Sequence, residues 1–128
     1  MSEAFIKRAA AKVEGAAYGD AVFSDGGAVW AGTREVAHAH GRSADGADVI
    51  EIRLTKAEVR ARREDLRADA RVGLRKNASD WIEFGISTKR DEADALELIG
   101  VAVAANLLTA KPGLPPSGAD LARRKRFH

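Results

Sequence analysis

Residues 49–54 read Val-Ile-Glu-Ile-Arg-Leu, an alternation of apolar and charged side chains that predicts a β-strand with one buried and one polar face. The next four residues, Thr55-Lys56-Ala57-Glu58, have the spacing of a capping box, in which a threonine hydroxyl and a glutamate satisfy the first free amides of a helix. We expect that helix to run to about Ala68. The chain therefore combines sheet and helix within a short stretch.

Further strands are indicated on both sides of this segment. Residues 70–75 and 81–86 alternate in the same way and flank a turn, so they predict a hairpin. Residues 34–40 are expected to form another strand. Residues 21–24 are strand-like, and the strand resumes at residues 28–30 after an Asp-Gly-Gly turn.

Two longer apolar stripes predict helices over residues 2–17 and 88–109. The expected order is α-β-β-β-α-β-β-α, which favours a two-layer α+β domain over residues 1–110, with a mostly antiparallel five-stranded sheet. Both of these helices are expected on one face of the sheet, with the charged helix near residues 56–68 packed more loosely. The predicted core is Phe5, Ile6, Val13, Val22, Ile50, Ile52, Leu54, Val72, Leu74, Ile82, Phe84, Ile86, Leu96, Ile99, Val103 and Leu107.

The charge of the chain is unevenly distributed. The 128 residues hold 21 basic and 19 acidic side chains. Residues 119–128 contain four of the basic and one of the acidic residues, so residues 1–118 keep 17 basic and 18 acidic side chains. A nucleic-acid-binding domain carries its basic excess on a folded face. We therefore expect nucleic-acid binding only through this tail, and we expect residues 111–128 to be a proline-containing linker and a disordered basic tail.

The absence of cysteine excludes a disulfide scaffold, an iron–sulfur site and a thiol nucleophile. No apolar run approaches the length of a membrane span. Charged residues occupy the N-terminal positions where a signal peptide would be apolar. These features predict a cytoplasmic protein that does not bind membranes, and the sequence indicates no cofactor.

Strand alternation also predicts what lies on the sheet face away from the helices, because successive side chains point to opposite faces. One interpretation is a solvated face with cross-strand ion pairs. The other is a binding face for a small ligand or a protein, since a large aromatic residue among charges is typical of an interface. The residues predicted on this face are Arg34, His38, His40, Glu51, Arg53, Arg71, Arg75, Trp81 and Glu83, with Val36 among them.

The pair His38-x-His40 places two imidazoles on one side of a strand, where they could clamp a metal ion. Glu51 or Asp45 would supply the third ligand of a zinc-type site. The alternative is that neither histidine has a role in metal binding. Glu35 with His38 is a candidate acid–base pair, but strand parity puts the two on opposite faces unless a bulge lies at residues 36–37.

The run Arg34-Glu35-Val36-Ala37-His38-Ala39-His40, with Trp30-x-Gly32 before it and Ser79-Asp80-Trp81-Ile82-Glu83 after it, resembles the small "luciferase domain" family of bacteria and fungi. The resemblance spans roughly residues 20–107. Family members often have a Gly-Trp pair and then a His-rich or Pro-rich run, where this chain has Ser79-Asp80-Trp81. The family has no settled reaction. The element order also resembles that of type III secretion chaperones, whose domains dimerise.

From these observations we expect a luciferase-like domain that binds a ligand or protein on its polar sheet face without catalysis. The alternative is a small enzyme or metal-binding protein that uses His38 and His40. A homodimer through the polar face is also expected, because opposed arginine and glutamate side chains are self-complementary about a two-fold axis.

Overall fold

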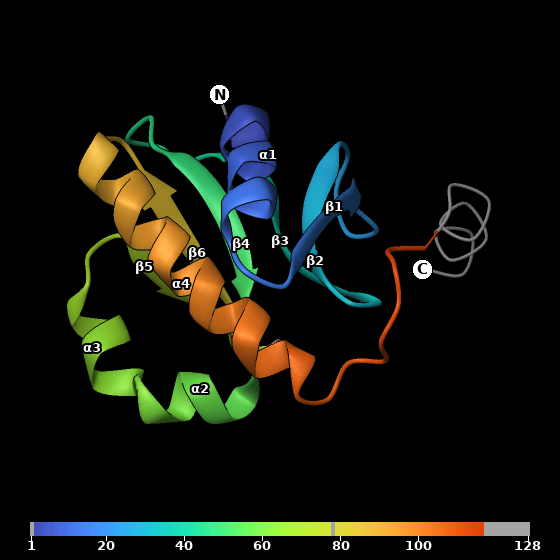
Figure 1. Ribbon diagram of the computed structural model, residues 1–128. Helices are drawn as coiled ribbons and strands as arrows, with labels where there is room; N and C mark the ends of the chain where they lie inside the picture. The colour runs from blue at the N-terminus through green and yellow to red at the C-terminus, as the bar shows by residue number, and fades with distance from the viewer. Residues whose placement is uncertain (1, 78, 117–128) are drawn as a thin grey trace.

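Six antiparallel strands form one sheet in the order β1-β2-β3-β4-β6-β5 in a computed structural model that describes residues 2–77 and 79–116 (Figure 1). The strands are β1 (Ala16–Asp20), β2 (Gly27–Ala31), β3 (Arg34–Arg42), β4 (Asp48–Arg53), β5 (Val72–Leu74) and β6 (Trp81–Ile86). The helices are α1 (Ser2–Lys12), α2 (Lys56–Ala61), α3 (Arg63–Ala68) and α4 (Lys89–Leu107). The predicted α+β class is confirmed, with six strands in place of five.

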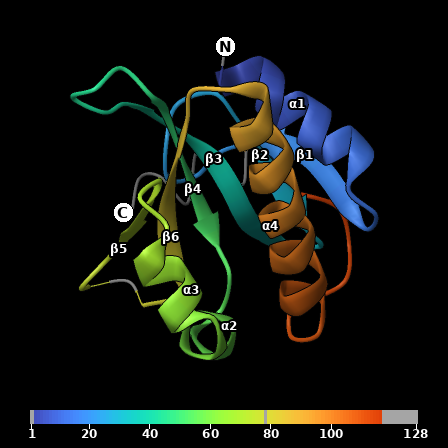
Figure 2. The same cartoon turned by 90° about the vertical axis from the view of Figure 1, so that its left-hand side faces the viewer.

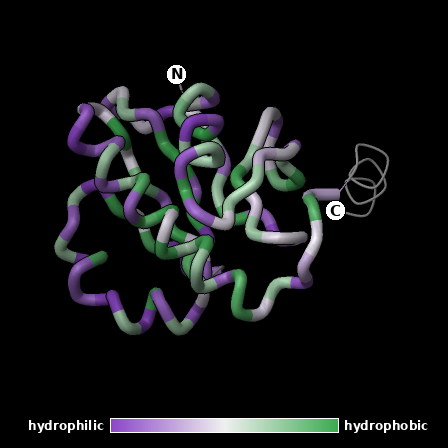
Figure 3. The backbone as a smooth tube through the Cα atoms, in the orientation of Figure 1, coloured by the Kyte–Doolittle hydropathy of each residue, from purple (hydrophilic) through white to green (hydrophobic). Residues whose placement is uncertain are grey.

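Helices α1 and α4 lie across the same face of the sheet, whereas α2 and α3 lie beside its β5 end (Figures 1 and 2). We call the sheet face turned away from α1 and α4 the polar face. Between the two layers, α1, α4 and the inward side chains of the strands form the main hydrophobic core. Figure 3 shows mostly hydrophilic colours along α2 and α3, consistent with their single buried residues, Val59 and Leu66.

Most of the predicted core residues are buried or partly buried in this cluster. Three differ. Val22 belongs to a second, smaller cluster with Trp30 on the polar face. Leu74 and Leu107 are largely exposed, so their assignment to the core was wrong. Each is the last residue of its element, where the neighbouring layer no longer covers the side chain.

The N-terminal segment differs most from the expectation. Helix α1 ends at Lys12 rather than at residue 17, and Gly15, with φ of +81°, turns the chain into β1. Residues 21–24, predicted as strand, are instead part of the connection between β1 and β2. Alanines at positions 16 and 17 continue the helical pattern in sequence, but pairing with Trp30 and Ala31 holds them in a strand.

The predicted helix over residues 56–68 is two short helices that meet at Arg62, whose φ and ψ are −105° and 10°. The threonine cap is confirmed, since Thr55 Oγ1 accepts a hydrogen bond of 3.2 Å from the Glu58 amide. The glutamate side chain instead pairs with Arg62 Nε at 3.0 Å. At α4, Thr88 and Asp91 form a complete capping box.

Strand β3 contains two bulges, one on each side of His38. Trp30 pairs with Glu35 and Val29 pairs with Ala37, which leaves Val36 as an extra residue in β3. Further on, Ala39 pairs with Ile50 and Arg42 pairs with Asp48, so two β3 residues face one β4 residue. Bulges re-aim side chains and are frequent beside functional sites.

After α4 the chain returns to the turn between β2 and β3. The backbone carbonyl of Lys111 accepts hydrogen bonds from the Thr33 amide at 3.2 Å and from Thr33 Oγ1 at 3.0 Å. The basic tail predicted at residues 119–128 lies outside the described residues. None of the helices that the structure describes combines the length and the apolar character needed to cross a membrane.

Candidate functional site

The bulge at Val36 brings Glu35 and His38 to the same face of β3. Val36 and Ala37 both point into the main core, so the alternation of sides is interrupted between Glu35 and His38. As a result, Glu35 Oε2 lies 2.8 Å from His38 Nδ1. The sequence allowed a Glu35–His38 pair only if a bulge lay at residues 36–37, and the structure contains that bulge.

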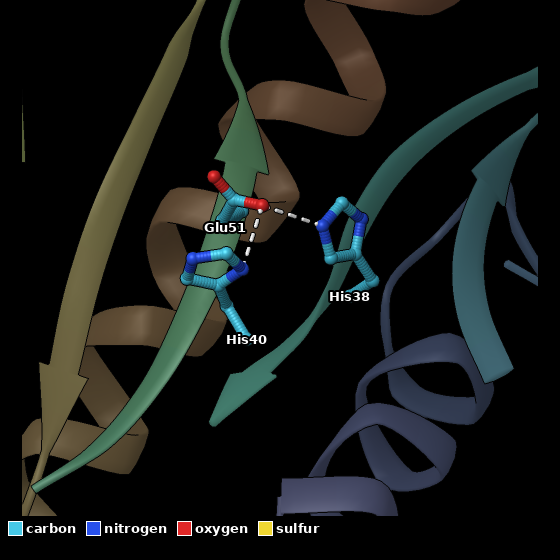
Figure 4. Close-up of side chains that lie close together, drawn as sticks. All are labelled: His38, His40 and Glu51. Carbon is cyan, nitrogen blue, oxygen red and sulfur yellow. Dashed lines mark hydrogen bonds and ion pairs between the residues drawn. The ribbon is translucent and has the colours of Figure 1, made fainter. Parts of the chain in front are cut away.

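A second carboxylate meets the other side of the same imidazole. His38 and Glu51 are direct partners across β3 and β4, and Glu51 Oε1 lies 2.8 Å from His38 Nε2. His40 approaches from beyond Ala39, with its Nδ1 3.2 Å from the same Glu51 oxygen. Figure 4 shows the Glu51 carboxylate between the two imidazole rings. One carboxylate oxygen is therefore shared by two histidines.

Glu35, His38, His40 and Glu51 form a cluster that is buried around His38 and exposed to solvent at His40. His38 is 1% exposed and Glu35 is 3% exposed, whereas the His40 side chain is 49% exposed. Trp81 covers His38, with their ring centroids 5.2 Å apart, and Phe23 meets the Trp81 ring at 6.0 Å. The site is thus reached from solvent beside His40.

Arg75 binds the second oxygen of Glu51. This contact leaves Glu51 Oε1 for the two imidazoles and holds the carboxylate in one orientation. Among the described residues, every buried side-chain nitrogen and oxygen atom has a hydrogen-bond partner. A purely structural role for the cluster, as a satisfied polar network on the sheet, is therefore also consistent with its geometry.

The chemistry of His38 follows from its two contacts. Each ring nitrogen faces a carboxylate oxygen at 2.8 Å, and each of these contacts requires a shared proton between the nitrogen and the oxygen. Nδ1 is enclosed by Glu35, whose other oxygen accepts a hydrogen bond from the Val22 amide. Nε2 faces Glu51 and His40, so a metal ion can replace a proton there.

Nine residues were predicted on the polar face. Seven of them lie on that face or beside the cluster of Glu35, His38, His40 and Glu51. Arg53 stacks near Trp81, with its guanidinium carbon 6.0 Å from the ring centroid, and pairs with Asp80 at 2.7 Å. Glu83 is the direct partner of Glu51 on β6. The remaining five members of this group are His38, His40, Glu51, Arg75 and Trp81.

Arg34 and Arg71 were placed wrongly. The Val36 bulge turns Arg34 toward α4, where its Nη1 donates to Asn106 Oδ1 at 3.2 Å and to Thr109 Oγ1 at 2.7 Å. Arg71 precedes β5 and reaches the start of α4 instead of the polar face. Val36, which alternation also put on the polar face, is fully buried in the main core.

Arg71 binds three carboxylates. Its guanidinium lies 2.8 Å from Asp69, 3.0 Å from Asp91 and 2.8 Å from Asp94. Hydrogen bonds from Arg71 lower the pKa of Asp69 and of Asp94, and the Ser87 amide is the main cause of the lowered pKa of Asp91. The same three contacts raise the pKa of Arg71. This cluster ties β5 to α4 and is remote from His38.

Asp45, the other candidate third ligand, does not join the histidines. It lies in the turn between β3 and β4, where Ser43 Oγ donates to it and the Ala47 amide lies 3.3 Å from Oδ1. The Ser43 hydrogen bond lowers the pKa of Asp45. Of the two proposed third ligands, the structure brings Glu51 to the site.

Sequence reasoning missed the role of the connection between β1 and β2. Val22 supplies an amide to Glu35, and Phe23 supplies an aromatic wall beside Trp81. The only sequence signal was a short apolar stretch at residues 21–23, which was interpreted as strand.

Comparisons with protein-family models, with curated proteins and with solved structures found no match for this chain.

Proposed function

We propose that this protein is a binding domain that holds a divalent transition metal ion, best matched by Zn²⁺, at His38, His40 and Glu51. The observation that carries the proposal is the convergence of one ligand atom from each residue, all within 4.8 Å of one another. Two imidazoles and one carboxylate are a common protein ligand set for catalytic or ligand-exchanging zinc.

Two of the three spacings between ligand atoms are close to those that a zinc ion requires. Two ligands of a tetrahedral zinc are about 3.3–3.6 Å apart when the metal–ligand bonds are about 2.0–2.2 Å long. His40 Nδ1 and Glu51 Oε1 are already 3.2 Å apart, and His38 Nε2 and Glu51 Oε1 are 2.8 Å apart. The distance between His38 Nε2 and Glu51 Oε1 would have to lengthen by roughly 0.5–0.8 Å. The two imidazole ligand atoms, which lie within 4.8 Å of each other, must reach the same spacing.

The position of Glu35, at the ring nitrogen of His38 that does not face Glu51, also supports a metal site. A metal-binding histidine usually donates its other ring N–H to a carboxylate, a backbone carbonyl or a water, which fixes the tautomer and the ring orientation. Glu35 Oε2 occupies that position at His38 Nδ1, while the Val22 amide donates a hydrogen bond to Glu35 Oε1. The tautomer that this contact favours leaves Nε2 to bind the metal.

Three protein ligands leave at least one coordination position for an exogenous group. The solvent-exposed side of the cluster, beside His40, is where such a group would enter. A carboxylate, phosphate or other anionic group of a ligand is the natural occupant, since it would meet both the metal and the Arg75 guanidinium. The metal would thus serve the binding function that the polar face was predicted to have.

Metal analysis of protein made without an affinity tag, after incubation with zinc and removal of the unbound ion, tests the proposal. We expect about one zinc per chain in the wild-type protein and a large loss in His40→Ala and Glu51→Gln. His128→Ala, which removes the third histidine of the chain, is the matched control and should retain the metal. Zinc-free wild-type protein, or full binding by His40→Ala, would contradict the proposal and leave His38 a structural residue.

Two further expectations stay proposals. Membership of the luciferase-domain family rests on the Arg34–His40 run and its flanking motifs. Self-association through the polar face is supported by Phe23, which is 54% exposed next to Trp81.

A further inference from the structure

A cavity that adjoins the histidine cluster lies at the end of the sheet where β3 begins and β4 ends. Its volume is about 390 Å³, within the size range of small-molecule sites. The walls come from the connection after β1, from β2 and the turn that follows it, and from the segment after α4. They are lined by Val22, Phe23, Trp30, Thr33, Arg34, Glu35, Arg53, Thr109, Ala110 and Lys111.

The lining carries an excess of positive charge. Arg34, Arg53 and Lys111 are cationic, and Glu35 is the one acidic residue among them. Both Glu35 oxygens are already bound, one to the Val22 amide and the other to His38. Glu35 forms its ion pair with His38 and none with the three cations of the cavity among the described residues.

Arg34 is the decisive residue. Its guanidinium is held by an amide oxygen and a hydroxyl, from Asn106 and Thr109, and it has no carboxylate within ion-pair distance in the described part of the chain. Lys111 likewise has no acidic partner among the described residues, whereas Arg53 is paired with Asp80. Two cations without counter-charges, one of them fixed in orientation, are preorganised for an anion.

Hydrogen bonds hold the backbone in place around the cations of the cavity. Thr33 binds the Lys111 carbonyl through both its amide and its hydroxyl, which fixes the segment after α4 against the turn between β2 and β3. Asn106 Nδ2 also donates to the Arg53 carbonyl at 2.7 Å. The exposed Phe23 ring and the edge of the buried Trp30 indole also line the cavity.

We propose that this cavity binds a small molecule with a carboxylate or phosphate group and an aromatic or apolar body. The anionic group would bind Arg34 and Lys111, and the body would lie against Phe23 and Trp30. The proposal goes beyond the metal site and does not require the metal.

Binding of three probes to chelator-treated protein, followed by NMR chemical-shift titration, tests it. The probes are phenyl phosphate, benzoate and the neutral benzyl alcohol. We expect one or both anions to bind, with shifts at the Trp30 indole N–H, and benzyl alcohol to bind at least about fivefold more weakly, as expected when charge-assisted hydrogen bonds are lost. A difference between phenyl phosphate and benzoate identifies the preferred anionic group.

Arg34→Gln and Lys111→Gln should each weaken binding of the preferred anion about five- to tenfold. Lys89→Gln, at the opposite end of α4, is the control and should leave the affinity unchanged. Lys111 is exposed, so its substitution tests the site even if Arg34→Gln impairs folding. The proposal is overturned if no anion binds, if benzyl alcohol binds equally well, or if Lys111→Gln and Lys89→Gln behave alike. Because the metal has been removed, failure here leaves the metal proposal unaffected.

Discussion

Glu35 Oε2 lies 2.8 Å from His38 Nδ1, although strict strand alternation would put the two side chains on opposite faces of the sheet. The extra residue Val36 makes the contact possible, because it joins Ala37 in the main core and restores Glu35 to the side of His38. A single bulge thereby places a buried carboxylate behind a histidine whose other nitrogen faces Glu51 and His40.

Substitution of Glu35 by glutamine is expected to weaken zinc binding about 10- to 100-fold, the usual cost of losing a carboxylate that orients a metal-binding histidine. The amide keeps the shape of the side chain but removes its charge beside His38 Nδ1. Isothermal titration with ZnCl₂ measures the change, and the exposed Glu97→Gln is the control. Equal zinc affinity in Glu35→Gln and the wild-type protein would show that Glu35 does not support a bound metal.

Phe84→Ala should reduce the free energy of unfolding by about 3–5 kcal/mol, because the ring is fully buried in the main core and its removal leaves a cavity. Chemical denaturation measures the loss. The exposed Phe23→Ala should cost about 1 kcal/mol or less. A loss below about 1 kcal/mol for Phe84→Ala would contradict the assigned side of β6.

Acid should remove the stabilisation that Arg71 provides. The pKa of Asp69, Asp91 and Asp94 is lowered in the folded protein, so these carboxylates contribute stability above their unfolded pKa of about 3.9 and lose it as the pH falls through their lower folded values. Arg71→Gln should therefore be clearly less stable than the wild-type protein at pH 7, and the difference should shrink below about pH 4.

Denaturation of both proteins at a series of pH values measures this difference. Arg67→Gln, an exposed substitution on α3, should give a small difference with little dependence on pH. A stability difference for Arg71→Gln that stays constant from neutral to acidic pH would show that the three carboxylates do not act through Arg71.

Trp81→Ala should weaken any self-association, because Trp81 and Phe23 form the aromatic part of the polar face. Sedimentation equilibrium over a wide range of concentrations measures it. A wild-type protein that stays monomeric throughout contradicts the predicted homodimer. A dimer that Trp81→Ala leaves intact would place the interface elsewhere.

Alternation in the sequence predicted β4 and β6 well, and with them the positions of Glu51, Arg53, Trp81 and Glu83. These strands lie in the interior of the sheet with one face against the helices. Apolar and polar side chains therefore alternate along them without interruption. The placement of Arg34 and Val36 failed because a bulge shifts parity without any distinctive residue in β3. Only the partner strand determines where the extra residue is accommodated.

The start of the chain was misread for a different reason. Alanine favours helix, so Ala16 and Ala17 extended the predicted helix into what is an edge strand. That error moved the first strand and hid the connection that supplies Val22 and Phe23 to the site. The histidine pair was identified as a metal candidate from its spacing, with Glu51 or Asp45 as the third ligand, but Glu35 depended on a bulge that only the folded chain reveals.

The proposed function depends on a metal ion bound between His38, His40 and Glu51. Anomalous diffraction at the zinc absorption edge, from crystals of the tag-free protein grown with ZnCl₂, tests it most directly. We expect an anomalous peak about 2.0–2.2 Å from His38 Nε2, His40 Nδ1 and Glu51 Oε1, with Glu35 still bound to His38 Nδ1. Zinc found only at other positions, with His38 Nε2 still in direct contact with Glu51, would contradict it.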